Sequence, residues 1–315
     1  MEVMTVVEKA QRIIAEVRKV VVGKDNTLVW ALAAMLSGGH ILMEDIPGVG
    51  KTTMALAFSK ALGLSYNRVQ FNPDVLPSDI TGYHVPDKET GKLIYRPGSI
   101  LCNLFLADEL NRATSRTQSA LLEAMEEGQV TVDGQSHSLP APFIVIATQN
   151  PTGAAGTQML PDSQMDRFTV RLQLGYPDPK DEMRMAKDRQ GSNPMDTVTC
   201  VVSAEELTQM QRLVAETYVA DSIIAYVVEL IGKTRRSDRL LQGASPRATL
   251  AVLAMVKAVA QLRGRDYVVP GDVQEVFVAA VAHRLLLNHV SQSQGISAEE
   301  ILQDILQAVP APKIQ

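Results

Sequence analysis

The feature that most constrains the fold is a change of pattern near residue 177. Before it, short apolar runs alternate with helical patterns, and after it only helical patterns continue. The apolar runs are Ile41–Glu44, Val69–Phe71, Leu104–Ala107, Phe143–Thr148 and Thr169–Leu174, and the helical patterns between them are Asp25–Ser37, Lys51–Leu62 and Thr117–Glu127. Runs of this kind are typical of strands buried on both faces of a parallel sheet. Their alternation with helices predicts a layered α/β domain.

The second part of the chain is predicted to be helical. Ser203 and Ser297 each stand three residues before a glutamate, which is the pattern of a capping box at a helix start. Ser245 precedes a proline, as expected for an N-cap before the first helical position. We therefore expect three segments: an α/β core over residues 1–177, a linker over 178–200 and an all-α domain over 201–315.

Composition limits the partners and the compartment. The net charge is −5 and aromatic residues make up only 4% of the chain, so binding to nucleic acid is not favoured. Two cysteines, Cys102 and Cys200, cannot form a disulfide framework. No apolar run reaches the roughly 18 residues of a membrane span, and the N-terminal stretch carries charges through its apolar pattern, unlike a signal peptide. We expect a reduced, soluble, cytoplasmic protein.

A glycine loop, Asp45-Ile-Pro-Gly-Val-Gly-Lys-Thr52, joins the first predicted strand to a helix. The N–H groups of such a loop can surround a phosphate, and the helix N-terminus favours the same negative charge. In the phosphate-loop pattern the lysine, here Lys51, reaches the β- and γ-phosphates, and the hydroxyl of Thr52 binds Mg²⁺. Asp45 stands where that pattern has its first glycine, so the turn must form without a glycine there.

Polar side chains end two other predicted strands. Asp108 and Glu109 follow one of them, where a carboxylate suits Mg²⁺ and a second carboxylate can orient or deprotonate water. We assign Asp108 to the metal and Glu109 to the water, with a solvated turn as the alternative. Asn150 follows the next strand, where it holds the attacking water or the γ-phosphate, or simply forms an Asn-Pro turn.

Two arginines complete the set of candidates. Arg167 follows an aspartate, and it is either an arginine finger that stabilises transition-state charge or one half of a surface ion pair. Arg247 lies just inside a predicted helix N-terminus, where a cation opposes the helix dipole. A nucleotide phosphate would offset that conflict, and a solvated arginine is the alternative.

Together these segments resemble the AAA+ ATPases, and more narrowly the MoxR family, over nearly the whole chain. The segments that carry the resemblance are LMEDIPGVGKTTMALAFSKALG, QFNPDVLPSDITGY, LADELNRATSRTQSALLEAMEEGQVTVDG, PFIVIATQNP, LPDSQMDRF and GASPRA. The resemblance implies an AAA+ P-loop NTPase core, with a parallel sheet flanked by helices, and a helical C-terminal lid. Loops of this family also tolerate an acidic residue at the position of Asp45.

The resemblance also implies roles for single residues. Asp108 and Glu109 would form Walker B, Asn150 sensor 1, Arg167 the arginine finger and Arg247 sensor 2. Walker A would comprise Gly48, Val49, Gly50, Lys51, Thr52 and Thr53. The segment that borders adenine would comprise Val22 and Gly23.

Two segments match insertions of this clade and are predicted as hairpins. Asp74–Pro97 would pair Ile80–Val85 with Leu93–Arg96, and Gln129–Leu139 would turn at Asp133-Gly134. Both are candidate contacts for a substrate or partner, with packing inside a ring as the alternative.

The implied function is binding of ATP with Mg²⁺ and its hydrolysis at the subunit interfaces of a homo-oligomeric ring. A finger from a neighbour requires a closed heterologous ring, which we expect to be a hexamer. The family implies chaperone-like remodelling or maturation of client proteins, often beside a protein with a von Willebrand A domain. The alternatives are a nucleotide-gated binding module with little turnover, a metal-insertion ATPase like that of magnesium chelatase, and a nucleic-acid motor.

The glycine loop gives a first prediction. Lys51→Ala removes the cation expected to contact the β- and γ-phosphates, so the variant should lose affinity for ATP. Titration of wild type and variant with a fluorescent ATP analogue measures this directly. Unchanged affinity in a folded variant contradicts the assignment of the loop.

Overall fold

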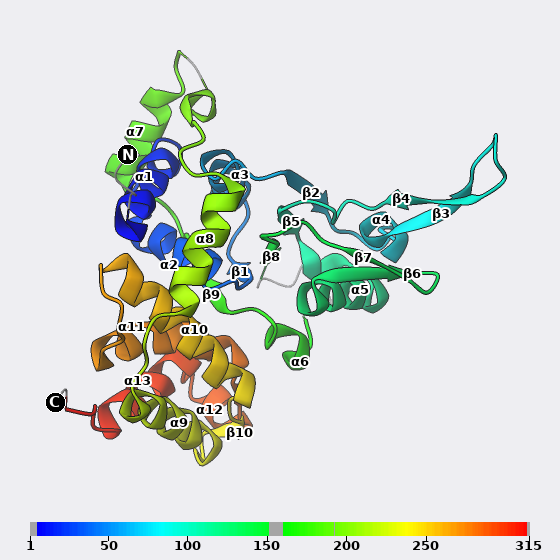
Figure 1. The fold of residues 1–315 in the computed structure, drawn as a ribbon. Helices are drawn as coiled ribbons and strands as arrows, with labels where there is room; N and C mark the ends of the chain where they lie inside the picture. Colours follow the sequence, from blue (N-terminus) through cyan, green and yellow to red (C-terminus); the bar gives the residue numbers. More distant parts are fainter. Residues whose placement is uncertain (1–4, 151–159, 192, 314–315) are drawn as a thin grey trace.

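The computed structural model describes residues 5–150, 160–191 and 193–313 (Figure 1). Its central sheet has five parallel strands in the order β2-β5-β8-β1-β9. Their bounds are β1 Ile41–Glu44, β2 Tyr66–Gln70, β5 Leu104–Asp108, β8 Ile144–Gln149 and β9 Val170–Leu172. The order places β8 between β1, which enters the glycine loop, and β5, which ends in the acidic pair. The carboxyl ends of these three strands therefore meet at one edge of the sheet.

Helices cover both faces of the sheet, as the apolar strand pattern predicts. Alternate side chains of one strand enter different cores: Leu104 and Leu106 belong to one, and Phe105 and Ala107 to the other. The first core contains residues of α1 (Val6–Arg18), α2 (Asp25–Leu36) and α3 (Lys51–Ala61). The second contains residues of α4 (Pro77–Thr81) and α5 (Ser115–Glu127). The predicted α/β core is confirmed.

Both predicted hairpins are present. They are β3 (Gly82–Pro86) with β4 (Leu93–Pro97), and β6 (Gln129–Val132) with β7 (Gln135–Ser138). The first begins later than predicted, because Ile80 and Thr81 close helix α4. The β3–β4 hairpin projects far from the body of the molecule (Figure 1). The rings of Tyr95 and His137 stack with their centroids 3.6 Å apart, so the two hairpins pack on each other.

The second domain is helical, as predicted. Its helices are α8 (Ala204–Ala215), α9 (Asp221–Arg235), α10 (Pro246–Leu262), α11 (Pro270–Val281), α12 (His289–Ser293) and α13 (Ala298–Ala308). The hydroxyls of Ser203, Ser245 and Ser297 accept backbone N–H bonds at the three expected helix starts. The structure adds a short antiparallel pair, β10 (Leu240–Gln242) with β11 (Leu286–Leu287). Strands of two or three residues are too short to show an alternating pattern in sequence.

The segment predicted as a linker contains a helix, α7 (Pro179–Asp188). Six of its ten residues are charged and none is buried, so few apolar residues mark it as a helix in the sequence. The remaining short helices are α6 (Asp162–Met165), η1 (Leu110–Arg112), η2 (Pro194–Thr197) and η3 (Ala282–Arg284). The boundaries at residues 177 and 200 stay predictions, because residues of both parts share the core that contains α1, α2 and α3.

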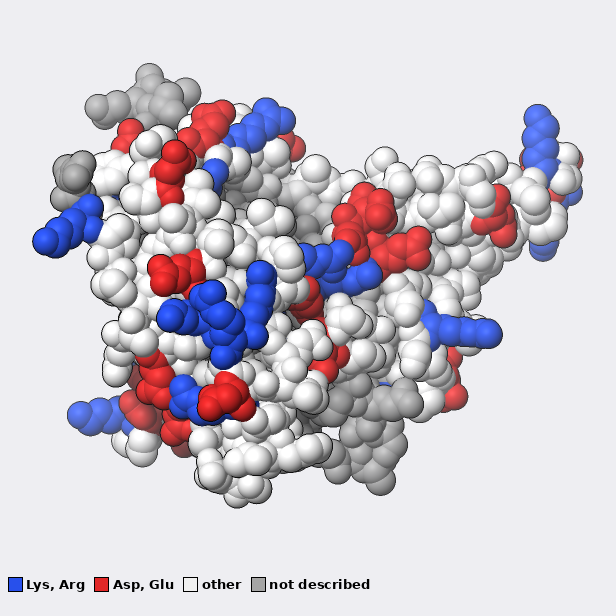
Figure 2. Space-filling model, turned by 90° about the horizontal axis from the view of Figure 1, so that it is seen from below, with Lys and Arg blue, Asp and Glu red and all other residues white. Residues whose placement is uncertain are grey.

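The lid docks through that shared core. Helix α10 contacts α2 and α1, and α11 contacts β9. Within the described ranges, no helix is long and apolar enough to cross a membrane. Basic and acidic side chains are interspersed on the face seen in Figure 2, and no broad basic surface appears there.

Candidate nucleotide site

The glycine loop turns at two glycines and leads directly into helix α3. Gly48 and Gly50 have φ values of 84° and 99°, which glycine adopts at little cost, and Gly50 is the N-cap of α3. The ammonium of Lys51 donates to the carbonyls of Asp45 at 2.6 Å and Ile46 at 3.1 Å. Burial lowers the pKa of Lys51, while Asp45, Asp108 and Glu109 oppose that shift. Lys51 is thus surrounded by acidic groups that favour its charged form.

Asp45 explains how the loop forms without the first glycine. Its backbone has no positive φ, and the residue is buried. One carboxylate oxygen accepts from the N–H of Ile46 at 2.9 Å. The other accepts from the N–H groups of Leu174 at 2.6 Å and Gly175 at 2.7 Å, just after β9. The aspartate therefore fixes the start of the loop to the segment that leads into α7.

The loop and the acidic strand end share one pocket of about 310 Å³. Its lining includes most of the sequence-predicted phosphate and catalytic residues: Gly48, Gly50, Lys51, Thr52, Thr53, Asp108, Glu109 and Asn150. The structure adds neighbours that sequence reasoning missed: Pro47, Arg68, Thr148 and Gln149. The strand order accounts for the meeting, since β1, β8 and β5 deliver these residues to one edge.

The carboxylate of Asp108 is held on both sides. Thr148 donates to Oδ1 at 2.6 Å, and Arg68 donates to Oδ2 through Nε and Nη2 at 3.1 and 2.7 Å. Thr148 lies on β8 and Arg68 on β2, the two strands that flank β5. These contacts satisfy both oxygens of a carboxylate that is largely removed from water.

Glu109 has a left-handed backbone, with φ 57° and ψ 44°, which is uncommon for a residue with a side chain. Its N–H donates to the hydroxyl of Thr148 at 2.8 Å, which helps to hold this conformation. Its carboxylate accepts from Arg112 at 2.8 Å and from Gln70 at 3.4 Å. Because of this turn, the carboxylate of Asp108 meets Thr148 and Arg68, whereas that of Glu109 meets Arg112. The two neighbouring carboxylates are therefore free to have different roles.

Mg²⁺ fits the groups that the pocket offers. The ion prefers oxygen ligands, and it is commonly held by one or two protein groups together with waters and substrate phosphates. Thr52 supplies a hydroxyl and Asp108 a carboxylate to the same pocket. Among the described residues, no group of three or more His, Cys, Asp and Glu is placed to hold a metal by itself.

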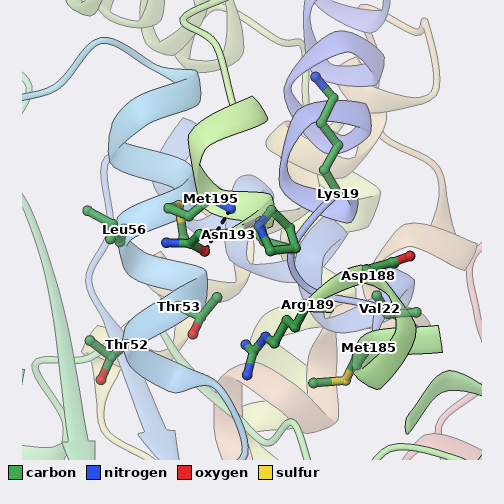
Figure 3. A pocket seen from close by; sticks show the side chains of 12 residues that line it. Lys19, Val22, Thr52, Thr53, Leu56, Met185, Asp188, Arg189, Asn193 and Met195 are labelled. Atoms are coloured by element: carbon green, nitrogen blue, oxygen red, sulfur yellow. Dashed lines mark hydrogen bonds between the residues drawn. The ribbon is translucent and has the colours of Figure 1, made fainter. Parts of the chain in front are cut away.

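Two adjoining hollows, of about 200 and 250 Å³, extend from the loop. Val22, one of the two residues predicted to border adenine, lines both, and Val49 of the glycine loop lines the second. Across from Thr53, helix α7 and the residue after it contribute Met185 and Arg189 (Figure 3). Sequence reasoning missed these two residues because it treated the helix as a linker.

Gly23 does not line these hollows and instead lies beside helix α7. Its φ is 72°, and a Cβ at this position would come within 1.9 Å of Oδ2 of Asp181 on α7. The missing side chain therefore lets α7 approach the turn between α1 and α2. The ammonium of Lys24 adds a bond to the carbonyl of Tyr176 at 2.8 Å.

Arg167 and Arg247 do not line the pocket that contains Lys51 and Glu109. They lie together in another pocket, of about 290 Å³, between the core and the lid. Both pair with Glu126 on α5, Arg167 at 2.9 Å. The structure thus gathers the predicted Walker A, Walker B and sensor 1 residues in one place and the two predicted arginines in another.

Two family models match the chain, one in the α/β core and one in the lid. A model described as "ATPase family associated with various cellular activities (AAA)" matches residues 40–170, and one for the AAA lid domain matches residues 232–305. The chain is 44% identical over 299 residues to YeaC of Bacillus subtilis, an uncharacterised protein, covering 95% of this chain and 93% of that one. It is 37% identical over 317 residues to Chaperone MoxR1 of Mycobacterium tuberculosis, covering 98% and 84%.

A solved structure is also similar over nearly its whole length. The crystal structure of a proposed ATPase from Cytophaga hutchinsonii superposes with a TM-score of 0.90 at 35% identity, covering 97% of this chain and 96% of that chain. The resemblance in sequence is therefore matched by a resemblance of the complete fold, core and lid together.

The contacts of Asp45 give a prediction on stability. Asp45→Ala removes the acceptor of three backbone N–H groups, so the free energy of unfolding should fall by about 1.5–3 kcal/mol. Urea unfolding measures the change. Asp45→Asn keeps one carbonyl oxygen as an acceptor and should lose less. Equal stability of Asp45→Ala and wild type contradicts the anchoring role.

Proposed function

Since this chain belongs to the MoxR family of AAA+ ATPases, which hydrolyse ATP, we propose that it completes its catalytic site between copies of itself. The observation that carries the proposal is the separation of Arg167 and Arg247 from the pocket of Lys51 and Glu109. A second copy that presents its two arginines to this pocket would bring all the predicted residues to one nucleotide.

Within one copy, the residues divide the work of binding and hydrolysis. The N–H groups of the loop and Lys51 hold the β- and γ-phosphates. Val22, Met185 and Arg189 surround the base, and Gly23 lets α7 approach them. Thr52 and Asp108 would hold Mg²⁺, which neutralises phosphate charge when it is bound. Glu109 orients the attacking water and accepts its proton.

Asn150 and Arg68 complete the phosphate end of the pocket. Asn150 follows β8 at the same edge as Glu109, where its amide suits the water or the γ-phosphate. Arg68 is a cation beside Asp108 that the sequence pattern did not indicate.

Arg167 and Arg247 act in trans in this proposal. The face that carries them contacts a nucleotide held by the next copy, so the interface is heterologous, and the assembly closes only as a ring. We expect a hexamer. Because the two arginines share one carboxylate partner, both should reach the neighbour together.

Hydrolysis in such a ring would drive remodelling of a client protein. The β3–β4 hairpin suits contact with a client or partner, because it projects from the body and exposes Tyr83 and Leu93. A von Willebrand A domain protein is the expected accessory partner, and the cytoplasm is the expected compartment. The proposal favours an active motor over a gated binding module because Glu109 stands beside the predicted metal ligand.

The role of Glu109 can be tested by Glu109→Gln. Glutamine keeps the shape of the side chain but cannot accept the proton, so hydrolysis should fall by about 10²-fold or more while ATP binding persists. Steady-state phosphate release and nucleotide titration measure the two properties. Glu123→Gln, an exposed glutamate on α5, is the matched control. Retained turnover in Glu109→Gln would move the base to another residue.

The interface can be tested by mixing variants. Arg167→Ala should hydrolyse ATP slowly, and adding Lys51→Ala subunits should restore activity. In a mixed ring the intact loop of an Arg167→Ala subunit meets the intact Arg167 of a Lys51→Ala subunit. Phosphate release is measured against the mixing ratio, and either variant alone is the control. Absence of rescue argues that Arg167 does not act in trans.

A further inference from the structure

One carboxylate joins the two predicted arginines. Glu126 stands near the end of α5, and its Oε2 lies 2.9 Å from Nη1 of Arg167. Its Oε1 pairs with Nη2 of Arg247, which belongs to the lid. The two oxygens of a single side chain thus hold one arginine from the core and one from the lid.

The surroundings fix the position of this pair. Arg284 is buried and bonds Asp166 through a side-chain oxygen at 2.5 Å and the carbonyl at 2.7 Å. The hydroxyl of Ser245 donates to the other oxygen of Asp166 at 2.8 Å. Asp166 precedes Arg167 and Ser245 lies two residues before Arg247. These contacts therefore bind the backbone of both arginines to the same junction.

The charges in the pocket do not balance. Arg167, Arg247 and Arg284 face two acidic groups, Glu126 and Asp166. His40 also lines the pocket, but burial lowers its pKa to about 4, so it is neutral near pH 7. One positive charge remains in excess, which suits the binding of an anion.

Only two of the three arginines are accessible to such an anion. The side chain of Arg284 is 2% exposed, whereas those of Arg167 and Arg247 are 29% and 46% exposed. Burial lowers the pKa of Arg284, Asp166 opposes that shift, and Arg247 adds to it. Arg284 is thus a structural cation, and Glu126 is the anion that the accessible arginines share.

We propose that Glu126 is a positioning residue. It pairs with Arg167 and Arg247 until a phosphate of the nucleotide bound by a neighbouring copy takes its place. Arginine binds carboxylate and phosphate with the same fork of N–H donors, so the two anions compete for one pair of side chains. The phosphate carries more charge, and the glutamate side chain is 38% exposed, so its ion pairs are weak enough to exchange. This inference rests on the proposed function, because it needs the two arginines to act in trans.

Competition gives a definite sign to the effect of a substitution. Glu126→Gln removes the competing charge, so the arginines should engage the neighbour's nucleotide more readily. The protein concentration that gives half-maximal specific ATPase activity should fall about fivefold, as expected for releasing one or two exposed ion pairs. Sedimentation velocity in ATPγS and Mg²⁺ should show assembly at correspondingly lower concentration.

The controls separate positioning from simple packing. Glu123→Gln, one turn earlier on the same helix, should leave both concentrations unchanged. Glu126→Ala, which lacks the amide of glutamine, should shift them in the same direction as Glu126→Gln. If Glu126 only props the arginines in place, both Glu126 variants will need more protein for assembly and activity. That result, or no shift, overturns the inference.

Arg167→Ala distinguishes failure of the inference from failure of the proposed function. If Arg167→Ala keeps wild-type turnover, the interface site itself is wrong. If Arg167→Ala loses turnover and Glu126→Gln shows no shift, only the role of Glu126 is wrong. In the double variant, the effect of Glu126→Gln on assembly should shrink, because one of its two partners is gone.

Discussion

The hydroxyl of Thr148 is the contact on which the phosphate end of the site depends. It donates to Asp108 and accepts from the N–H of Glu109, so one group fixes both acidic residues. It can do so only because β8 lies between the strand of the loop and the strand of the acidic pair. The sheet order therefore determines that Asp108, Glu109 and the glycine loop share one pocket, although the loop is far from the acidic pair in the chain.

A second constraint joins the two parts of the protein. The lid and the first layer of helices bury side chains in one continuous core, and α11 packs on β9. Arg284 extends that junction with polar contacts, since it reaches the carbonyls of Asp166 and Phe168 in the core. The lid therefore helps to place Arg167 of the core as well as its own Arg247. Core and lid are best considered as one unit.

Much of this architecture could be predicted from sequence because it depends on local signals. Apolar runs marked four of the five strands, whereas Val69–Phe71 overlaps only the end of β2, a strand with no buried residue. Serine caps marked three lid helices, and Asp133-Gly134 marked a hairpin turn. The glycine loop and the acidic pair were also local patterns. Helix α7 was missed, because six of its ten residues are charged and none is buried. The pair β10–β11 was too short to leave a pattern.

Long-range partners were beyond sequence reasoning for a different reason. Arg68 meets Asp108 from forty residues away, and Glu126 meets Arg247 across two domains. A charged residue on a strand or helix surface has the same local appearance whether it faces water or another charge. The site residues themselves were chosen for their chemistry, and their separation into two pockets appeared only in three dimensions.

The anchoring of Asp45 has a consequence for how such sequences can change. Replacing the aspartate with the glycine of the common loop pattern would leave the N–H groups of Leu174 and Gly175 without their acceptor. Restoring the consensus at residue 45 alone is therefore unfavourable, even though the loop itself would accept it. The constraint falls on residue 45 alone, because any residue except proline at positions 174 and 175 keeps the backbone N–H that needs this acceptor.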